Sequence, residues 1–228
     1  NEAYSPEILG MLAAIGIEKG KPFNPDEKLK KTLTEAVAVG NATARTIAFK
    51  PQMKDAYLSP GSAWFFPFVG GSYQFLAQPG VRNLAARVLY SYNYTGVTPA
   101  MALEMVGKGS QYVMATTDAK GAPLDGSKTY KIQLPANIPA KDFWSFVVYD
   151  NQSRSMLQTD QQFPSIGSKD QDIVINTDGS VDVWFGPTAP KGHERNWVQT
   201  VPGKGWSVLL RLYGLEKSWL DKTWKPGE

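Results

Sequence analysis

The chain has 228 residues, of which 42% are hydrophobic, 20% are charged and none is cysteine, and its formal net charge is +3. This length can bury a sizeable core in one large domain, or in one domain with a smaller helical part. The lack of cysteine excludes disulfides, thiolate metal sites and a cysteine nucleophile. Because no basic run would bind a phosphate backbone, we expect no nucleic-acid partner.

Two further functional classes are disfavoured by composition. No apolar stretch approaches the ~20 residues of a membrane-spanning helix, so the chain is predicted not to span a membrane. His193 is the only histidine, and with no thiol available we predict neither a metal centre nor a cofactor. The composition itself fits either the cytoplasm or the periplasm.

Residues 1–50 are predicted to be helical. Ser5 is the expected N-cap of a first helix that starts at Pro6 and ends near Gly16. Asn24 and Pro25 predict the start of a second helix, in which apolar residues recur every three to four positions. These residues are Leu29, Leu33, Ala36, Val37, Ala44 and Ile47. We expect this apolar stripe to pack on the body of the protein or on a neighbouring subunit.

The segment 51–81 is rich in glycine and proline, which disfavours long regular elements. Its aromatic run, from Trp64 to Phe68, could line a ligand site, form an interface or belong to the core of an irregular segment. Helices are predicted again over residues 82–94 and from Pro99 to about Val106.

From Gln111 onward the hydrophobic periodicity becomes two, which predicts strands. They are expected over residues 111–117, 129–134, 143–149, 172–176, 181–185 and 206–213. Asp178-Gly179 predicts a hairpin turn between the fourth and fifth of them. The fold class is therefore predicted to be mainly β with α. A helical and irregular connecting segment over residues 1–107 would precede an antiparallel β-sandwich of jelly-roll type over residues 108–228.

The C-terminal half also resembles a bacterial family of unknown function, DUF1214. The resemblance rests on motifs spread in order over residues 105–228, among them the runs Phe143 to Asp150, Phe185 to Pro187, Pro202 to Trp206 and Arg211 to Gly214. This resemblance implies a sandwich with jelly-roll character, a bacterial source and often export. It therefore favours a periplasmic or secreted location, while a cytoplasmic one stays open, and it implies no reaction.

Residues 1–105 resemble the linker region that follows a second family of unknown function, DUF1254, most clearly in the run Lys21 to Asp26. Because that upstream domain is not part of the chain, we expect a trimmed or separately produced C-terminal portion. Its long helix would then pack against the missing domain or form a homo-oligomer.

A first polar cluster follows the predicted central strand and contains Tyr149, Asp150 and Arg154. Strands that end in Asp-Asn commonly turn through hydrogen bonds from side chains to the backbone, and we favour that structural role. Asp150 is also a candidate catalytic carboxylate.

A second polar cluster contains His193, Glu194, Arg195 and Trp197. An imidazole beside a carboxylate could act in general acid–base catalysis, which makes His193 and Glu194 candidate catalytic residues. A solvated loop anchored by the Trp197 side chain is the favoured alternative.

Arg211 and Tyr213 share one face of the last strand. If that face looks inward, Arg211 should meet a carboxylate, because an unpaired buried charge is costly. Asp150, Asp182 and Glu194 are the candidate partners, and a structural salt bridge is favoured over a substrate clamp.

Two functions remain open from the sequence. The first is a ligand-binding or assembly module of the bacterial cell envelope, since aromatic residues are abundant and no catalytic motif is present. Tyrosine and tryptophan faces suit a small polar ligand or a glycan. The candidate ligand-binding residues are Tyr149, Arg154, Arg195, Trp197, Arg211 and Tyr213. The second is a metal-independent hydrolase or lyase acting on a polar, carbohydrate-like substrate, which requires the two polar clusters to converge.

Overall fold

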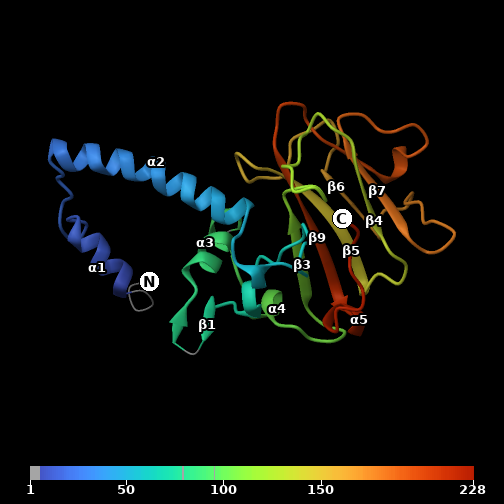
Figure 1. Cartoon of the computed structure of the whole chain (residues 1–228), viewed down its shortest axis with the longest axis horizontal. Coiled ribbons are helices and arrows are strands. Elements are labelled where there is room, and N and C mark those ends of the chain that lie inside the picture. Colours follow the sequence, from blue (N-terminus) through green and yellow to red (C-terminus); the bar gives the residue numbers. More distant parts are fainter. Residues whose placement is uncertain (1–5, 79, 95) are drawn as a thin grey trace. The chain divides into compact units, whose positions relative to one another are not determined.

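The computed structural model describes residues 6–78, 80–94 and 96–228 (Figure 1). The chain divides into two compact units, Asn1–Arg45 and Thr46–Glu228. Residues 46–107, which the sequence assigns to a connecting segment, therefore lie in the same compact unit as the predicted strands.

Both N-terminal helices are present, as α1 (Pro6–Ala14) and α2 (Glu27–Phe49). The expected cap Ser5 lies outside the described residues. The start of α2 differs from the prediction, because Asp26 and not Asn24 is the capping residue: its Oδ1 accepts the Leu29 N–H at 2.7 Å. Leu29 and Leu33 of the predicted apolar stripe are partly buried, whereas Val37 is 70% exposed.

The strands of the second unit form three sheets. A small hairpin consists of β1 (Leu76–Gln78) and β2 (Val81–Arg82). The four-stranded sheet has the order β3 (Ser110–Ala115), β9 (Trp206–Leu215), β5 (Ala140–Asp150) and β6 (Ser165–Gly167). The three-stranded sheet has the order β4 (Tyr130–Leu134), β7 (Val181–Gly186) and β8 (Trp197–Gln199).

The unit is β-rich with helices, but the jelly roll is not confirmed. The sheets do not close, and among the described strand pairs β7 and β8 run parallel while the other pairs are antiparallel. Short helical turns connect the elements: η2 (Lys54–Ala56), η3 (Val69–Gly71), η4 (Glu194–Asn196) and α5 (Lys217–Leu220).

One predicted strand does not form. Residues 172–176 contain no strand, although the turn at Asp178 is present and β7 follows it. The backbone N–H and C=O of Val174 are instead bound at 2.8 Å by the side-chain amide of Asn196. A side chain thus satisfies the groups that a neighbouring strand would otherwise pair.

The four-stranded sheet is covered on both faces. One face packs against the three-stranded sheet in a shared core that includes Phe146, Leu210 and Phe185. The other face packs against α3 (Leu84–Asn93), α4 (Pro99–Ala102) and the aromatic segment before them. Figure 1 shows this order, with α3 and α4 on one side of β3 and β9, and β4 and β7 on the other.

The aromatic segment belongs to the core, which is one of the three roles that the sequence predicted for it. Phe65 exchanges two backbone hydrogen bonds with Met114 of β3, at 2.9 and 2.8 Å. Because side chains alternate along an extended chain, Trp64 enters the core between the sheets and Phe65 enters the core beneath α3.

No helix in the described part of the chain is long and apolar enough to cross a membrane.

Candidate functional site

A cavity of about 180 Å³ lies between the four-stranded sheet and its helical cover. We call it the Arg211 cavity. Five of its ten lining residues are tyrosines, and one residue carries a charge. The lining residues are Pro67, Phe68, Tyr90, Tyr94, Met101, Tyr112, Tyr149, Leu209, Arg211 and Tyr213.

The sheet register builds the floor of this cavity. Tyr112 of β3 and Ser145 of β5 flank Arg211 of β9 as direct cross-strand partners. In the next row on the same face, Tyr213 lies between Ser110 and Phe143. The alternation of side chains therefore places Arg211 and Tyr213 on the helix-facing side of the sheet, as their shared strand face suggests.

Arg211 is partly buried, and its Nε donates a hydrogen bond to Ser145 Oγ at 2.9 Å. The predicted carboxylate partner is wrong: among the described residues Arg211 forms no ion pair, and no Asp or Glu lines the cavity. The three candidate carboxylates bind elsewhere. Asp150 pairs with Lys204, Asp182 with Lys131, and Glu194 accepts the Gly192 N–H.

Several tyrosine hydroxyl groups belong to the residues that line the same cavity. Ser110 Oγ donates to the Tyr112 hydroxyl at 2.8 Å, and the Tyr112 and Tyr213 hydroxyls lie 3.1 Å apart. The Tyr94 hydroxyl donates to Met114 Sδ at 3.3 Å. Within the described chain, the Tyr149 hydroxyl has no hydrogen-bond partner.

Burial raises the pKa of three of these phenols. It raises the pKa of Tyr112 to about 12 and raises the pKa of Tyr94 above its ordinary value. Burial also raises the pKa of Tyr149, although the nearby Arg211 charge acts in the opposite direction. At neutral pH the cavity therefore offers one positive charge and several neutral hydroxyls, an arrangement suited to binding an anionic group.

The other members of the first polar cluster have structural partners. Asp150 is buried and accepts the backbone N–H of Gln152 at 2.7 Å as well as the Lys204 ammonium. Arg154 lies over the Tyr92 ring, with its Cζ 4.4 Å from the ring centre, and donates to the Tyr92 hydroxyl at 3.2 Å.

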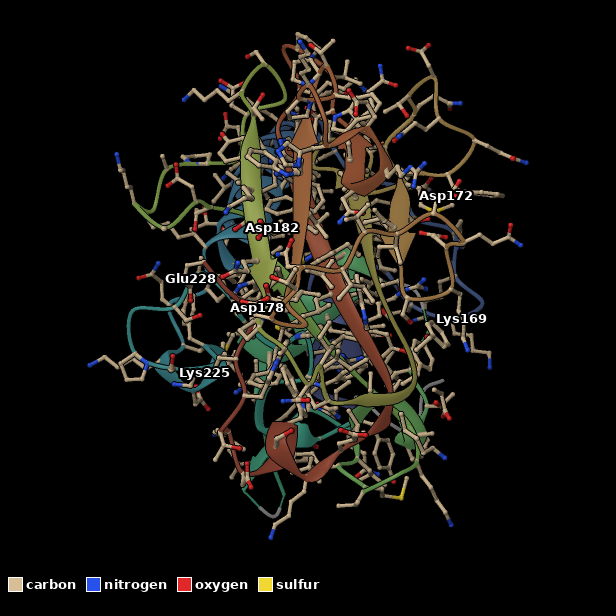
Figure 2. The ribbon with its side chains drawn as sticks, turned by 90° about the vertical axis from the view of Figure 1, so that its right-hand side faces the viewer. Lys169, Asp172, Asp178, Asp182, Lys225 and Glu228 are labelled. Atoms are coloured by element: carbon tan, nitrogen blue, oxygen red, sulfur yellow. The ribbon has the colours of Figure 1, made fainter. Side chains whose placement is uncertain are left out.

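The second polar cluster lies on η4 and its flanks. His193, Glu194 and Arg195 are exposed, and the His193 ring lies 4.8 Å from the Trp184 ring. The Trp197 indole N–H donates to the Gly186 carbonyl at 2.9 Å, in keeping with a structural anchor. Asn196 fixes this loop by donating to the carbonyl of Asp182, which is labelled in Figure 2.

The two clusters line different cavities. His193, Glu194, Arg195 and Asp182 line an opening of about 360 Å³ beside the start of β7. Asp150 and Arg154 line a space of about 10 Å³ beneath the end of β5. No hydrogen bond among the described residues joins the His193 and Glu194 side chains to each other or to Asp150.

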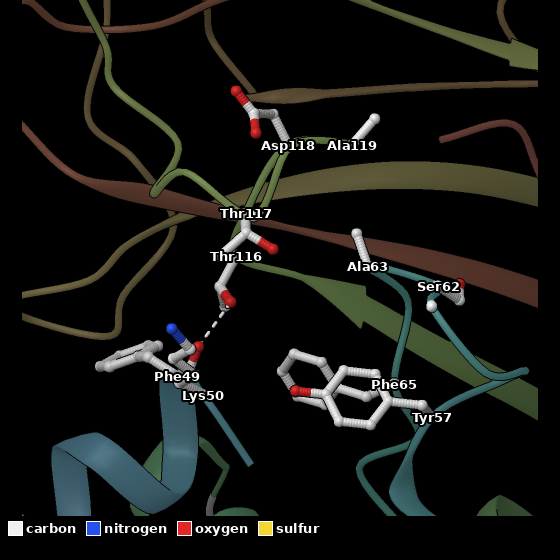
Figure 3. A pocket seen from close by; sticks show the side chains of 12 residues that line it. Phe49, Lys50, Tyr57, Ser62, Ala63, Phe65, Thr116, Thr117, Asp118 and Ala119 are labelled. Carbon is white, nitrogen blue, oxygen red and sulfur yellow. Dashed lines mark hydrogen bonds between the residues drawn. The ribbon is translucent and has the colours of Figure 1, made fainter. Parts of the chain in front are cut away.

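A further opening of about 280 Å³ lies at the end of α2 (Figure 3). Lys50 and Asp118 are its charged lining residues. Asp118 Oδ1 accepts the N–H groups of Lys120 and Ala122, each at 2.9 Å, and Thr116 Oγ1 donates to the Phe49 carbonyl at 2.6 Å. These polar groups hold the local backbone, so this opening offers less binding chemistry than the Arg211 cavity.

Sequence reasoning named Tyr149, Arg211 and Tyr213, which the structure brings together, but missed the cavity walls. Tyr112 could have been found from its alternation with Met114 on β3. Tyr90 and Tyr94 are four residues apart, which places them on one side of α3 and its C-cap. The position of Phe68 in the cavity has no such signal, because its segment has no regular period.

Comparison with known proteins supports the family resemblance and indicates no activity. The sequence model of a family described as protein of unknown function (DUF1214) matches residues 109–217, which supports the resemblance noted from the sequence. The resemblance of residues 1–105 to the DUF1254 linker region is not shown and stays a prediction. No curated protein matches the chain.

The chain is similar to two solved structures. The VPA0106 protein from Vibrio parahaemolyticus is 20% identical, with a TM-score of 0.48; the match covers 99% of this chain and 51% of that chain. An uncharacterized protein from Burkholderia cenocepacia is 18% identical, with a TM-score of 0.43; the match covers 99% of this chain and 47% of that chain. The chain thus spans about half the length of these solved proteins.

Proposed function

We propose that the chain is a ligand-binding module that holds a small organic molecule in the Arg211 cavity. The observation that carries this proposal is the partly buried guanidinium of Arg211, which has no ionic partner among the described residues and is surrounded by tyrosines. A volume of about 180 Å³ is below the ~300–1,000 Å³ of sites for drug-sized ligands, so the ligand is a smaller molecule.

A screen tests this proposal. A library of small organic acids, amides, alcohols and amines is measured by thermal shift, and hits are confirmed by calorimetry. Ligands that bind the native state and not the unfolded chain raise the Tm by an amount that grows with the ratio of ligand concentration to Kd. Met101→Trp places a large side chain in the cavity wall and should abolish binding, whereas Met156→Trp, at a residue 52% exposed outside the cavity, should not. Hits that bind both variants equally would place the site elsewhere.

The assembly part of the expected function receives separate support from α2. Val37, a member of the predicted apolar stripe of this helix, is 70% exposed. Burial of such a side chain stabilises an interface by ~1.5–3 kcal/mol. We therefore propose that α2 also mediates self-association.

A periplasmic or secreted location is part of the same proposal, and its support is the DUF1214 resemblance. Fractionation of the native bacterial cells checks it. Recovery in the periplasmic or secreted fraction would agree with an envelope role, and recovery with cytoplasmic markers alone would contradict it.

The hydrolase or lyase alternative keeps its candidates Asp150, His193 and Glu194 as proposals only. It is less supported, because the two clusters line different cavities.

A further inference from the structure

We infer that the ligand of the Arg211 cavity is a small carboxylate, bound through the terminal nitrogens of Arg211. This inference rests on the proposed function and names the chemical class of the molecule. Its evidence is the hydrogen bonding of Arg211, the charge balance of the cavity and the nature of the walls.

The hydrogen bonding of Arg211 leaves its two terminal nitrogens, Nη1 and Nη2, available to a ligand. The Nε donor is used by Ser145 Oγ at 2.9 Å, and Ser145 is itself 7% exposed. This bond fixes the plane of the guanidinium, while Nη1 and Nη2 have no acceptor among the described residues. Two parallel donors of this kind match the two oxygens of a carboxylate.

The charge balance of the cavity selects an anion. In the described part of the chain, its ten lining residues include one cation, Arg211, and no Asp, Glu, Lys or His. A guanidinium held partly out of water without a counter-ion is unfavourable, so an anionic ligand gains an interaction that a neutral isostere lacks. A cationic ligand would add repulsion.

The walls favour a carboxylate over a phosphate. Phosphate sites usually combine several cations or a row of backbone N–H groups, because the group carries up to two charges and three acceptor oxygens. Here one arginine stands among the rings of Phe68, Tyr90 and Tyr149 and the apolar side chains of Met101 and Leu209. These flat, apolar surfaces suit the hydrocarbon body of a singly charged organic acid.

Calorimetry with matched compounds tests the inference. The probes are acetate, hexanoate and benzoate, each with its primary amide and its amine, together with inorganic phosphate. At least one carboxylate should bind about tenfold or more tightly than its own amide, and neither the amines nor phosphate should bind.

Two variants of the full chain assign this preference to Arg211. Arg211→Gln should remove the advantage of the carboxylate over its amide, and Arg211→Lys should restore part of it as a point charge. Lys169→Gln removes an exposed cation that is labelled in Figure 2 and does not line the cavity, so it should change nothing. If Arg211→Gln does not fold, the wild-type series and Arg211→Lys still decide the result.

The possible failures are distinct. If amides or amines bind in the cavity as tightly as the carboxylates, or if phosphate is the preferred anion, the carboxylate inference is wrong while the ligand-binding proposal stands. The inference is also overturned if the carboxylate advantage survives in Arg211→Gln. If neither these probes nor the wider library binds at all, both the inference and the proposed function fail.

Discussion

At the scale of single residues, Asp150 illustrates how polar groups near the sheets are satisfied by the protein itself. Its buried carboxylate accepts the N–H groups of Gln152 and Ser153 and the ammonium of Lys204. Burial alone would raise the pKa of Asp150, but these hydrogen bonds outweigh it and lower the pKa below its ordinary value. The ionised form is thus the one that the fold stabilises.

Asp150→Asn should therefore lower the free energy of unfolding by ~2 kcal/mol at pH 7, because hydrogen bonds to a charged group are lost. Urea unfolding measures this change. The matched control is Asp172→Asn, at an exposed residue (Figure 2), which should stay within ~0.5 kcal/mol of the wild type.

The pH dependence of this difference follows from the lowered pKa. A carboxyl group with a depressed folded-state pKa contributes stability above its unfolded pKa of ~3.9 and loses it as the pH falls through the folded value. The gap between wild type and Asp150→Asn should be constant above about pH 5 and shrink below about pH 4. A gap that does not change with pH would contradict the assigned role.

Tyr112 changes the free energy of unfolding in the opposite direction, because its contribution is lost as the pH rises. Its folded-state pKa is about 12, mainly through burial, against ~10 in the unfolded chain. The folded state therefore keeps a proton that the unfolded state loses, so stability falls as the pH rises from ~10 towards the folded value. Tyr112→Phe should make this fall less steep in Tm measurements from pH 9 upward. Tyr73→Phe, at a residue 38% exposed, should keep the wild-type slope.

The surroundings of Arg211 show the limit of sequence reasoning at this scale. Strand alternation correctly placed Arg211 and Tyr213 on one face. The prediction of a carboxylate partner for Arg211 was wrong. The surface that faces this side chain comes from α3, α4 and an irregular segment more than a hundred residues earlier in the chain. Nothing in the periodicity of β9 says which residues those segments present.

At the scale of elements, the strands with long apolar runs were predictable from the sequence. The places where a side chain binds the backbone groups that a strand would otherwise pair were not. β5 and β9 follow directly from nearly continuous hydrophobic sequences that are covered on both faces. Residues 172–176 carry a similar strand pattern, yet Asn196 takes the backbone groups of Val174. An amide 22 positions away cannot be read from the local sequence.

Gly126 holds two loops at close range, and this predicts its intolerance of a side chain. Its N–H donates to the Lys204 carbonyl at 2.9 Å, and its carbonyl accepts the Thr200 hydroxyl at 2.8 Å. A Cβ at this position would clash with the carbonyl oxygen of Val201. Gly126→Ala should cost ~2 kcal/mol or more in urea unfolding, because backbone must shift to relieve the clash.

Gly96 provides the control for this change, since a Cβ there would meet no described residue within 4 Å apart from its chain neighbours. Gly96→Ala should have little effect on stability. Equal stabilities for the two alanine variants would show that the loop around Gly126 can relax, contrary to the packing described.

Helix α2 predicts a concentration-dependent mass. If the apolar stripe of α2 mediates self-association, the wild-type protein should sediment as a larger species at high concentration. Val37→Glu should then shift the protein towards the monomer. Ala38→Glu adds the same charge to an exposed position about 100° around the helix from Val37, away from the other stripe residues, and should not. Identical masses for wild type and Val37→Glu at all concentrations would remove the assembly proposal.

At the scale of the whole molecule, the position of the Arg211 cavity follows from the layering of the second unit. The face of the four-stranded sheet that packs against the three-stranded sheet is filled by large apolar side chains. Its other face must accept helices and an irregular aromatic segment, whose fit is less complete and leaves the cavity. The sequence indicated the β-rich class and most of the long strands. It indicated neither the parallel β7–β8 pair nor the position of this cavity, because both depend on contacts between distant segments.

The Nε–H resonances of the arginine side chains, observed by NMR, show whether Arg211 binds an anionic ligand in this cavity. The Arg211 signal is assigned by its absence in Arg211→Lys. On titration with the tightest-binding carboxylate of the series, the account predicts a saturable shift of this signal with the dissociation constant found by calorimetry. The signals of Arg154 and Arg195 should stay in place. Saturation of binding without any change at Arg211 would contradict the account.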